Sequence, residues 1–131
     1  MKKINRNKSS LIDTKKEINF VFNGKKYTGF KGDTLGSALL ANNVKLIGRS
    51  FKYHRPRGII SHGSEEPNGM VELINNHYNE PNTKITTLEL YEGLKAKSQN
   101  CWPSVKYDLM SINDKLSNFI SAGFYYKTFM W

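Results

Sequence analysis

Alternating hydrophobic and polar positions predict a β-hairpin near the start of the chain. Hydrophobic residues alternate with others over 18–22, and a second strand-like run covers 25–30. Asn23-Gly24 separates the two runs, and this pair favours a type I′ turn because both of its positions adopt positive φ. We therefore predict two antiparallel strands, with ordered structure starting at Glu17.

A helical spacing of three and four residues replaces the alternation after the hairpin. Asp33 or Thr34 can accept a free backbone N–H of the first helical turn, and Asn42-Asn43 can end the helix because asparagine tolerates the left-handed conformation. The pattern predicts one short amphipathic helix whose apolar face consists of Leu35, Ala38 and Leu39.

Three further strands are predicted downstream, at 70–74, 85–90 and 94–98. The order of hairpin, helix, long loop, strand and hairpin is typical of a β-grasp fold, in which a mixed sheet wraps across one helix. The fold class is therefore α+β. A short helix is predicted from Ser111 to about Phe119, so that the domain is followed by a C-terminal helical and aromatic extension.

The segment 48–68 lacks both strand alternation and helical spacing, so it is expected to be a long ordered loop. Such loops inside compact domains are usually functional or disordered, and the aromatic residues here argue against disorder. Its cations allow three interpretations: pairing with Glu65, Glu66 or acids of neighbouring domains, binding of a nucleotide phosphate, or binding of nucleic acid. The candidate residues for a phosphate or cofactor contact are Arg49, Lys52, Tyr53, Arg55 and Arg57.

Composition narrows the class of protein. The net charge of +9 comes mainly from residues 1–16 and 45–58, so it belongs to a basic tail and the loop. No stretch approaches the roughly 18 apolar residues of a membrane span. Cys101 is the sole cysteine and cannot form an internal disulfide, which makes a cytoplasmic protein the default expectation.

Several long motifs identify a family resemblance. The runs FNGKKYTGFKGDTLGSALLANNVKLIGRSFKYHRPRGI, GSEEPN, TTLELYEGLKAKSQNCWPS and SAGFYYKTFMW closely resemble the N-terminal region of the α subunit of heterotetrameric sarcosine oxidase. The resemblance implies a β-grasp domain related to [2Fe–2S] ferredoxins. It also implies a larger enzyme that demethylates sarcosine using FAD, FMN, NAD and tetrahydrofolate, with the other domains and subunits as partners.

The residues themselves give no support for a cluster or for catalysis. A plant-type cluster needs four thiolates, and the long loop has none. We predict no metal site, no catalytic residue and no membrane contact, and nucleic acid is a weaker alternative than an acidic protein partner. The predicted organisation is a disordered basic tail over 1–16, a ferredoxin-like domain without a cluster over 17–100, and a linker extension over 101–131. The two functional hypotheses are a docking domain of a sarcosine oxidase and a small basic binding module.

Overall fold

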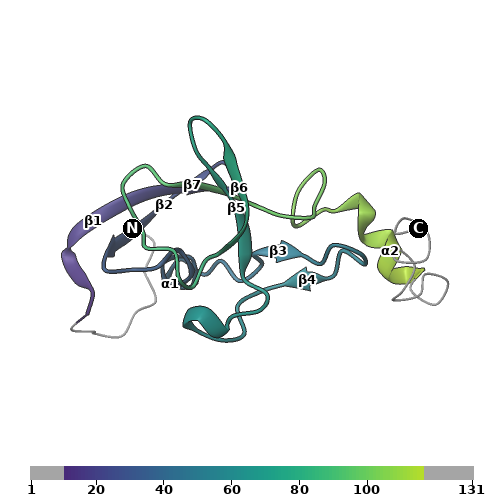
Figure 1. Ribbon diagram of the computed structural model, residues 1–131, viewed down its shortest axis with the longest axis horizontal. Coiled ribbons are helices and arrows are strands. Elements are labelled where there is room, and N and C mark those ends of the chain that lie inside the picture. The colour runs from purple at the N-terminus through teal and green to yellow at the C-terminus, as the bar shows by residue number, and fades with distance from the viewer. Residues whose placement is uncertain (1–10, 117–131) are drawn as a thin grey trace.

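The structure is a computed structural model that describes residues 11–116. A five-stranded sheet lies over the helix α1, and a small two-stranded ribbon projects from one end of the domain (Figure 1). The elements in chain order are β1 (Asp13–Phe22), β2 (Lys25–Lys31), α1 (Leu35–Ala41), β3 (Gly48–Arg49), β4 (Pro56–Arg57), η1 (Gly63–Glu65), β5 (Met70–Ile74), β6 (Asn79–Lys84), β7 (Lys95–Ser98), η2 (Leu109–Ser111) and α2 (Ile112–Lys115).

The predicted hairpin is present as β1 and β2. Asn23 and Gly24 form its turn with φ of 51° and 77°, as a type I′ turn requires. The Asn23 side chain also donates to Ser98 Oγ at 2.8 Å and accepts from Ser98 N at 2.8 Å, so the turn is fixed to β7. The strand begins at Asp13, earlier than the predicted start at Glu17, with an irregular register between these two residues.

The sheet is mixed, with the strand order β2-β1-β7-β5-β6. β1 and β7 are parallel, and the other neighbouring strands are antiparallel. A parallel pair needs a long crossover connection, and α1 lies within it. The β-grasp prediction, a mixed sheet with one helix packed on it, is confirmed for this part of the chain.

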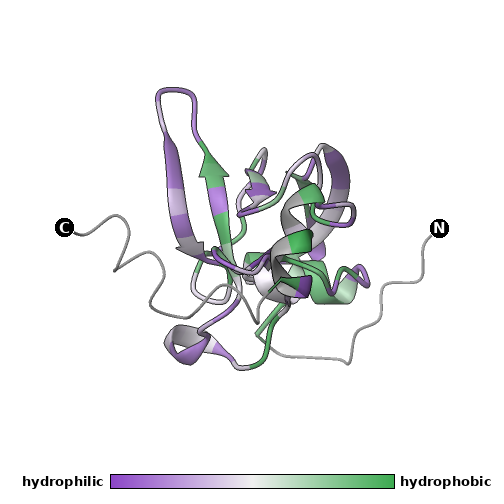
Figure 2. Ribbon diagram, turned by 90° about the vertical axis from the view of Figure 1, so that its right-hand side faces the viewer, coloured by the Kyte–Doolittle hydropathy of each residue, from purple (hydrophilic) through white to green (hydrophobic). Residues whose placement is uncertain are grey.

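Hydrophobic residues from the helix, the sheet and the intervening segments form one core. β5 contributes hydrophobic residues to it, whereas the neighbouring edge strand β6 is mostly hydrophilic (Figure 2). Gly29 on β2 allows the close packing of the helix, because an added Cβ would lie 2.4 Å from Leu90 Cδ2 and 3.1 Å from Ala38 Cβ. The buried core consists of Phe20, Phe22, Leu35, Ala38, Leu39, Ile47, Val71, Leu73, Ile85, Leu90, Leu94 and Ala96.

The N-terminus of α1 explains why one strand prediction is wrong. Thr34 caps the helix by accepting from Ser37 N at 3.1 Å, as predicted. The next free N–H groups, those of Leu35 and Gly36, donate to Leu88 O and Ile85 O at 2.9 Å each. The segment 85–90 is therefore irregular instead of a strand, because its carbonyl groups satisfy the helix end, and β5 pairs with 79–84.

The predicted loop 48–68 contains the ribbon β3–β4 and the 3-10 turn η1, so it is more regular than expected. α2 lies within the helix predicted from residue 111 to 119, but the end of that helix and the aromatic segment 119–131 fall outside the described residues. Within residues 11–116, no helix has the length and apolar character needed to cross a membrane.

Candidate functional site

The two-stranded ribbon is built from local main-chain hydrogen bonds. Gly48 and Arg49 pair with Arg57 and Pro56. The tip is closed by Ser50 N donating to Arg55 O at 3.0 Å, and Ser50 Oγ accepts from Arg55 N at 3.0 Å. These hydrogen bonds fix the backbone from which the side chains of the ribbon project.

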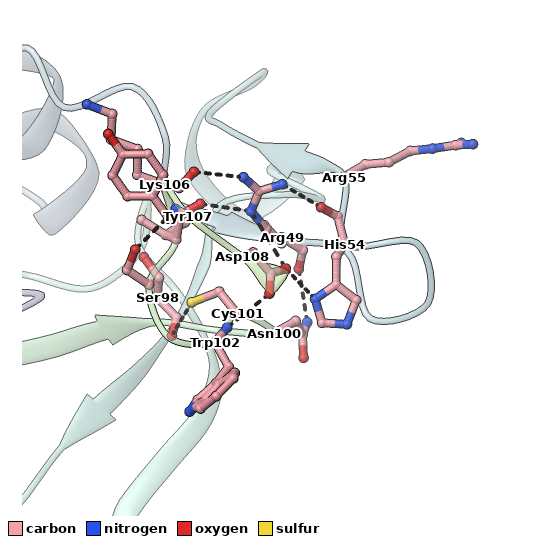
Figure 3. Close-up of polar contacts among 12 residues, drawn as sticks. Arg49, His54, Arg55, Ser98, Asn100, Cys101, Trp102, Lys106, Tyr107 and Asp108 are labelled. Atoms are coloured by element: carbon pink, nitrogen blue, oxygen red, sulfur yellow. Dashed lines mark hydrogen bonds and ion pairs between the residues drawn. The ribbon is translucent and has the colours of Figure 1, made fainter. Parts of the chain in front are cut away.

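Arg49 points from the ribbon toward the segment that follows β7. Its Nε donates to Val105 O at 2.8 Å, Nη1 donates to His54 O at 2.7 Å, and Nη2 lies 3.4 Å from Lys106 O (Figure 3). The side chain is largely buried. Arg49 therefore stabilises the connection between two parts of the chain, and its guanidinium is already occupied by carbonyl oxygens.

Asp108 is the buried acid at the centre of this connection. Its Oδ2 lies 2.5 Å from His54 Nδ1 and 3.8 Å from Arg49 Nε, and its Oδ1 accepts from Trp102 N at 3.0 Å. A buried carboxylate is stable when it is paired and hydrogen-bonded, as it is here. We call the group Arg49, His54 and Asp108 the clasp, since it fastens the ribbon to the segment 101–108.

The clasp was not foreseen from the sequence, although one signal points to Asp108. It is the only acidic residue between Glu92 and Asp114, and it follows a chain region rich in basic and aromatic residues. A lone acid in such a region is a candidate partner for the cations of the loop.

Lys52, Tyr53 and Arg55 form a separate group on the ribbon. Arg55 Cζ lies 4.6 Å and Lys52 Nζ lies 5.1 Å from the centroid of the Tyr53 ring, which are cation–π distances. Arg55 is exposed and extends away from the clasp (Figure 3). The five predicted cofactor-contact residues are therefore divided among different surroundings, and their contact with a phosphate stays a prediction.

Arg57 borders a small hollow beside the ribbon. Its Nη1 donates to Asn68 Oδ1 at 2.9 Å. The hollow has a volume of about 220 Å³ and is lined by Arg49 and Arg57, but not by Lys52, Tyr53 or Arg55. Of the predicted cations, Arg49 and Arg57 line this hollow; the Arg49 guanidinium bonds to carbonyl oxygens, whereas the Arg57 guanidinium bonds to the Asn68 side chain.

Glu66 organises the second half of the loop. The side chain is fully buried, and its two carboxylate oxygens accept four main-chain hydrogen bonds: Oε2 from Ile60 N at 2.9 Å and Ser61 N at 2.6 Å, and Oε1 from Asn68 N at 2.9 Å and Gly69 N at 3.1 Å. Burial raises the pKa of Glu66, but these four hydrogen bonds outweigh burial and the net pKa lies below its usual range. The interpretation that an arginine of the loop pairs with Glu66 is wrong, because main-chain N–H groups satisfy this carboxylate.

Cys101 lies beside the clasp, at the edge of a larger hollow of about 570 Å³ between β7 and the segment 103–106. Burial raises the pKa of the Cys101 thiol, and the negative charge of Asp108 raises it further. A raised pKa keeps the thiol protonated at neutral pH, which disfavours both metal ligation and nucleophilic attack. Residues 11–116 contain no cluster of three or more His, Cys, Asp or Glu side chains placed to hold a metal ion.

Comparison with known proteins gives consistent similarities. Residues 15–101 match a family model described as a 2Fe-2S iron-sulfur cluster binding domain. The chain is 55% identical over 124 residues to sarcosine oxidase subunit alpha of Rhizobium meliloti (strain 1021), covering 95% of this chain and 13% of that protein. It is 36% identical over 88 residues to sarcosine oxidase subunit alpha of Corynebacterium sp. (strain U-96), covering 65% of this chain and 9% of that protein.

A solved structure, L-proline dehydrogenase from P. horikoshii, is similar in fold. The TM-score is 0.50 at 24% sequence identity, and the match covers 68% of this chain and 16% of the other. This chain therefore spans a small fraction of the length of the proteins that it matches.

Proposed function

The chain belongs to the 2Fe-2S iron-sulfur cluster binding domain family and is homologous to the N-terminal region of sarcosine oxidase subunit alpha, and from this premise we propose that it is a docking domain of a sarcosine oxidase-type assembly. That assembly is a cytoplasmic, flavin-dependent oxidoreductase that oxidatively demethylates sarcosine to glycine and passes the one-carbon unit to tetrahydrofolate. The other parts of the assembly bind FAD, FMN, NAD and folate, and this chain contributes structure instead of catalytic residues.

The residues present do not fit a [2Fe–2S] cluster. Four thiolate ligands are required, and the sequence provides only Cys101. The raised pKa of Cys101 works against thiolate formation. In the long loop, the buried anion is the carboxylate of Glu66, held by four main-chain N–H groups. We therefore assign no electron-transfer step to this domain.

The clasp is the observation that carries the docking proposal. Arg49 and His54 of the ribbon contact Asp108, which lies more than 50 residues later in the sequence, and the carboxylate of Asp108 is buried. Such a network holds both segments in one arrangement without requiring a ligand. Preorganised surfaces of this kind bind partners with a smaller entropic cost.

The same end of the domain carries exposed aromatic and aliphatic side chains. The ribbon, η2 and α2 lie together on the side opposite β1 (Figure 1). Phe51 and Tyr107 are each 69% exposed. Aromatic residues of this kind, with an exposed arginine such as Arg55, are enriched at protein–protein interfaces. The remaining large exposed hydrophobic residues of this end are Trp102, Leu109, Ile112 and Leu116.

A binding measurement tests the proposal. A sarcosine oxidase assembly is prepared with subunit alpha lacking its own N-terminal domain, and the full chain is added in increasing concentration. We expect saturable binding that weakens at least tenfold for a Phe51→Ser, Tyr107→Ser double variant.

The matched control is Tyr91→Ser. Tyr91 is 45% exposed. Two residues later, Gly93 N donates to Asn19 O of β1, so Tyr91 lies near β1 and away from the ribbon. This variant should bind like the unmodified chain. No binding by the unmodified chain, or equal losses for Tyr91→Ser and the double variant, would contradict the docking proposal.

A further inference from the structure

The hollow beside the ribbon has the composition of an anion site. Its lining includes two arginines and several carboxamide side chains, but no aspartate or glutamate. A concave surface that contains basic and neutral polar groups and no acidic ones favours a negatively charged group, because no like charge in the lining opposes it. We infer that this hollow binds the phosphate group of a small molecule, with Arg57 as its principal charged contact.

Arg57 has donors left for a ligand. A guanidinium group carries five N–H donors in a fixed fork. Among the described residues, Asn68 Oδ1 is the acceptor of a hydrogen bond from this group, at Nη1 and 2.9 Å. That bond orients the side chain at the rim of the hollow, and the remaining N–H groups suit bidentate contact with phosphate oxygens.

Carboxamide residues from other segments complete the lining. Asn82 belongs to β6 and Gln99 follows β7, so the lining combines residues of the ribbon with residues of the five-stranded sheet and its end. Asn100 Nδ2 donates to Arg49 O at 3.0 Å, which connects this part of the lining to the ribbon. Polar residues from several segments of the chain therefore surround the hollow, which suits the tetrahedral oxygens of phosphate better than the two coplanar oxygens of a carboxylate.

The dimensions restrict the ligand. Pockets that enclose drug-sized ligands measure about 300–1,000 Å³, whereas this hollow measures about 220 Å³. It can enclose a phosphate group, but the rest of a larger molecule would extend past the rim. Phe51 belongs to the lining and is 69% exposed, so a planar group attached to the phosphate would lie near its ring.

This site differs from the contact predicted from sequence. Arg49 directs its guanidinium to carbonyl oxygens and Asp108, and Lys52 and Arg55 flank the Tyr53 ring. Of the five residues predicted to contact a phosphate, Arg57 is the one assigned that contact here. The carboxamide residues of the hollow were not indicated by the charge pattern. The inference is independent of the docking proposal, because the phosphate site can exist in the isolated chain.

The test is an NMR titration of the full ¹⁵N-labelled chain with inorganic phosphate, with sodium chloride adjusted to hold ionic strength constant. We expect saturable amide shifts at Arg57, Asn82 and Gln99. Arg57→Gln should weaken binding at least tenfold. The matched control, Arg55→Gln, removes the same charge from the same ribbon outside the hollow and should change binding less than twofold.

Two further variants make the result specific. Asn82 has φ of 56°, so Asn82→Gly removes the carboxamide while keeping a compatible backbone, and it should weaken phosphate binding several-fold. Titration with adenosine monophosphate distinguishes the source of the phosphate. If a nucleotide is preferred, adenosine monophosphate binds more tightly than inorganic phosphate, and Phe51→Ala removes only this gain in affinity. If the two ligands bind equally tightly, the hollow recognises the phosphate group alone. Absence of saturable shifts, or equal weakening by Arg57→Gln and Arg55→Gln, would overturn the inference.

Discussion

Replacing Glu66 by glutamine removes the charge from the buried carboxylate while nearly keeping its shape. Each oxygen of Glu66 accepts two main-chain N–H groups. A carboxamide keeps one acceptor oxygen and presents an NH₂ group in place of the other. Whichever way the new side chain lies, two main-chain donors lose their acceptor and face another donor.

The structure indicates the size of the effect. Leaving a buried donor without an acceptor costs about 1–3 kcal/mol. Ile60 and Ser61 are less buried than Gly69, so we expect the NH₂ group to face Ile60 and Ser61, where water can replace part of the lost bonding. The neutral side chain also avoids the cost of burying a charge. The expected net loss is therefore about 2–3 kcal/mol, a large part of the roughly 5–15 kcal/mol that typically stabilises a domain.

Urea denaturation of the full chain measures this loss. With a typical slope of about 1–3 kcal/mol per molar urea, the midpoint should fall by about 1 M or more. The matched control is Glu65→Gln, because Glu65 is the preceding residue, carries the same charge and is exposed. A loss below about 1 kcal/mol for Glu66→Gln, or equal losses for both variants, would refute the assignment of Glu66 as the organising anion of the loop.

The folded-state pKa of Glu66 is lowered, so the stabilisation by its carboxylate is fully present above the unfolded-state pKa of about 4.3 and is lost as pH falls through the folded-state pKa. The difference in unfolding free energy between the unmodified chain and Glu66→Gln, measured in urea, should therefore shrink in acid. A constant difference would contradict the lowered pKa. Asp108→Asn breaks a buried pair and should destabilise the chain by on the order of 3 kcal/mol. Relative to the unmodified chain, amide hydrogen exchange should accelerate more over 48–57 and 101–108 than in β1. Unchanged exchange over 48–57 and 101–108 would exclude a clasp. The Cys101 thiol should react with a disulfide reagent at pH 8 more slowly in the folded chain than in the same chain in urea, because its pKa is raised; equal rates would show a normal thiol.

Local chemistry made much of the fold predictable from sequence. The Asn23-Gly24 turn and the Thr34 cap depend on neighbouring residues, and both are present as expected. The strand predicted at 85–90 is absent, although apolar residues of this segment do enter the core. Its carbonyl groups accept hydrogen bonds from the N-terminal end of α1 and not from a neighbouring strand. The hydrophilic segment 79–84 is a strand because it pairs with β5, which its own composition does not reveal.

The candidate site was less predictable, because charge patterns do not give side-chain directions. The cations of residues 45–58 predict a candidate site in the loop, and most of them lie on the ribbon. Arg49, however, contacts Asp108 and carbonyl oxygens far along the chain, and these contacts depend on the path of the segment after β7. Glu66 is likewise satisfied by its own loop, and four main-chain donors cannot be recognised from residue types alone.

We propose that this ferredoxin-like fold is a docking domain without an iron–sulfur cluster. The most direct measurement is anaerobic incubation of the full chain with ferrous iron and sulfide, followed by removal of unbound ions, determination of iron and acid-labile sulfide per chain, and visible absorption spectroscopy. With a single cysteine in the sequence, the account predicts iron and sulfide far below one per chain and no cluster absorption. About two irons and two sulfides per chain, the content of a [2Fe–2S] cluster, together with cluster absorption, would contradict it.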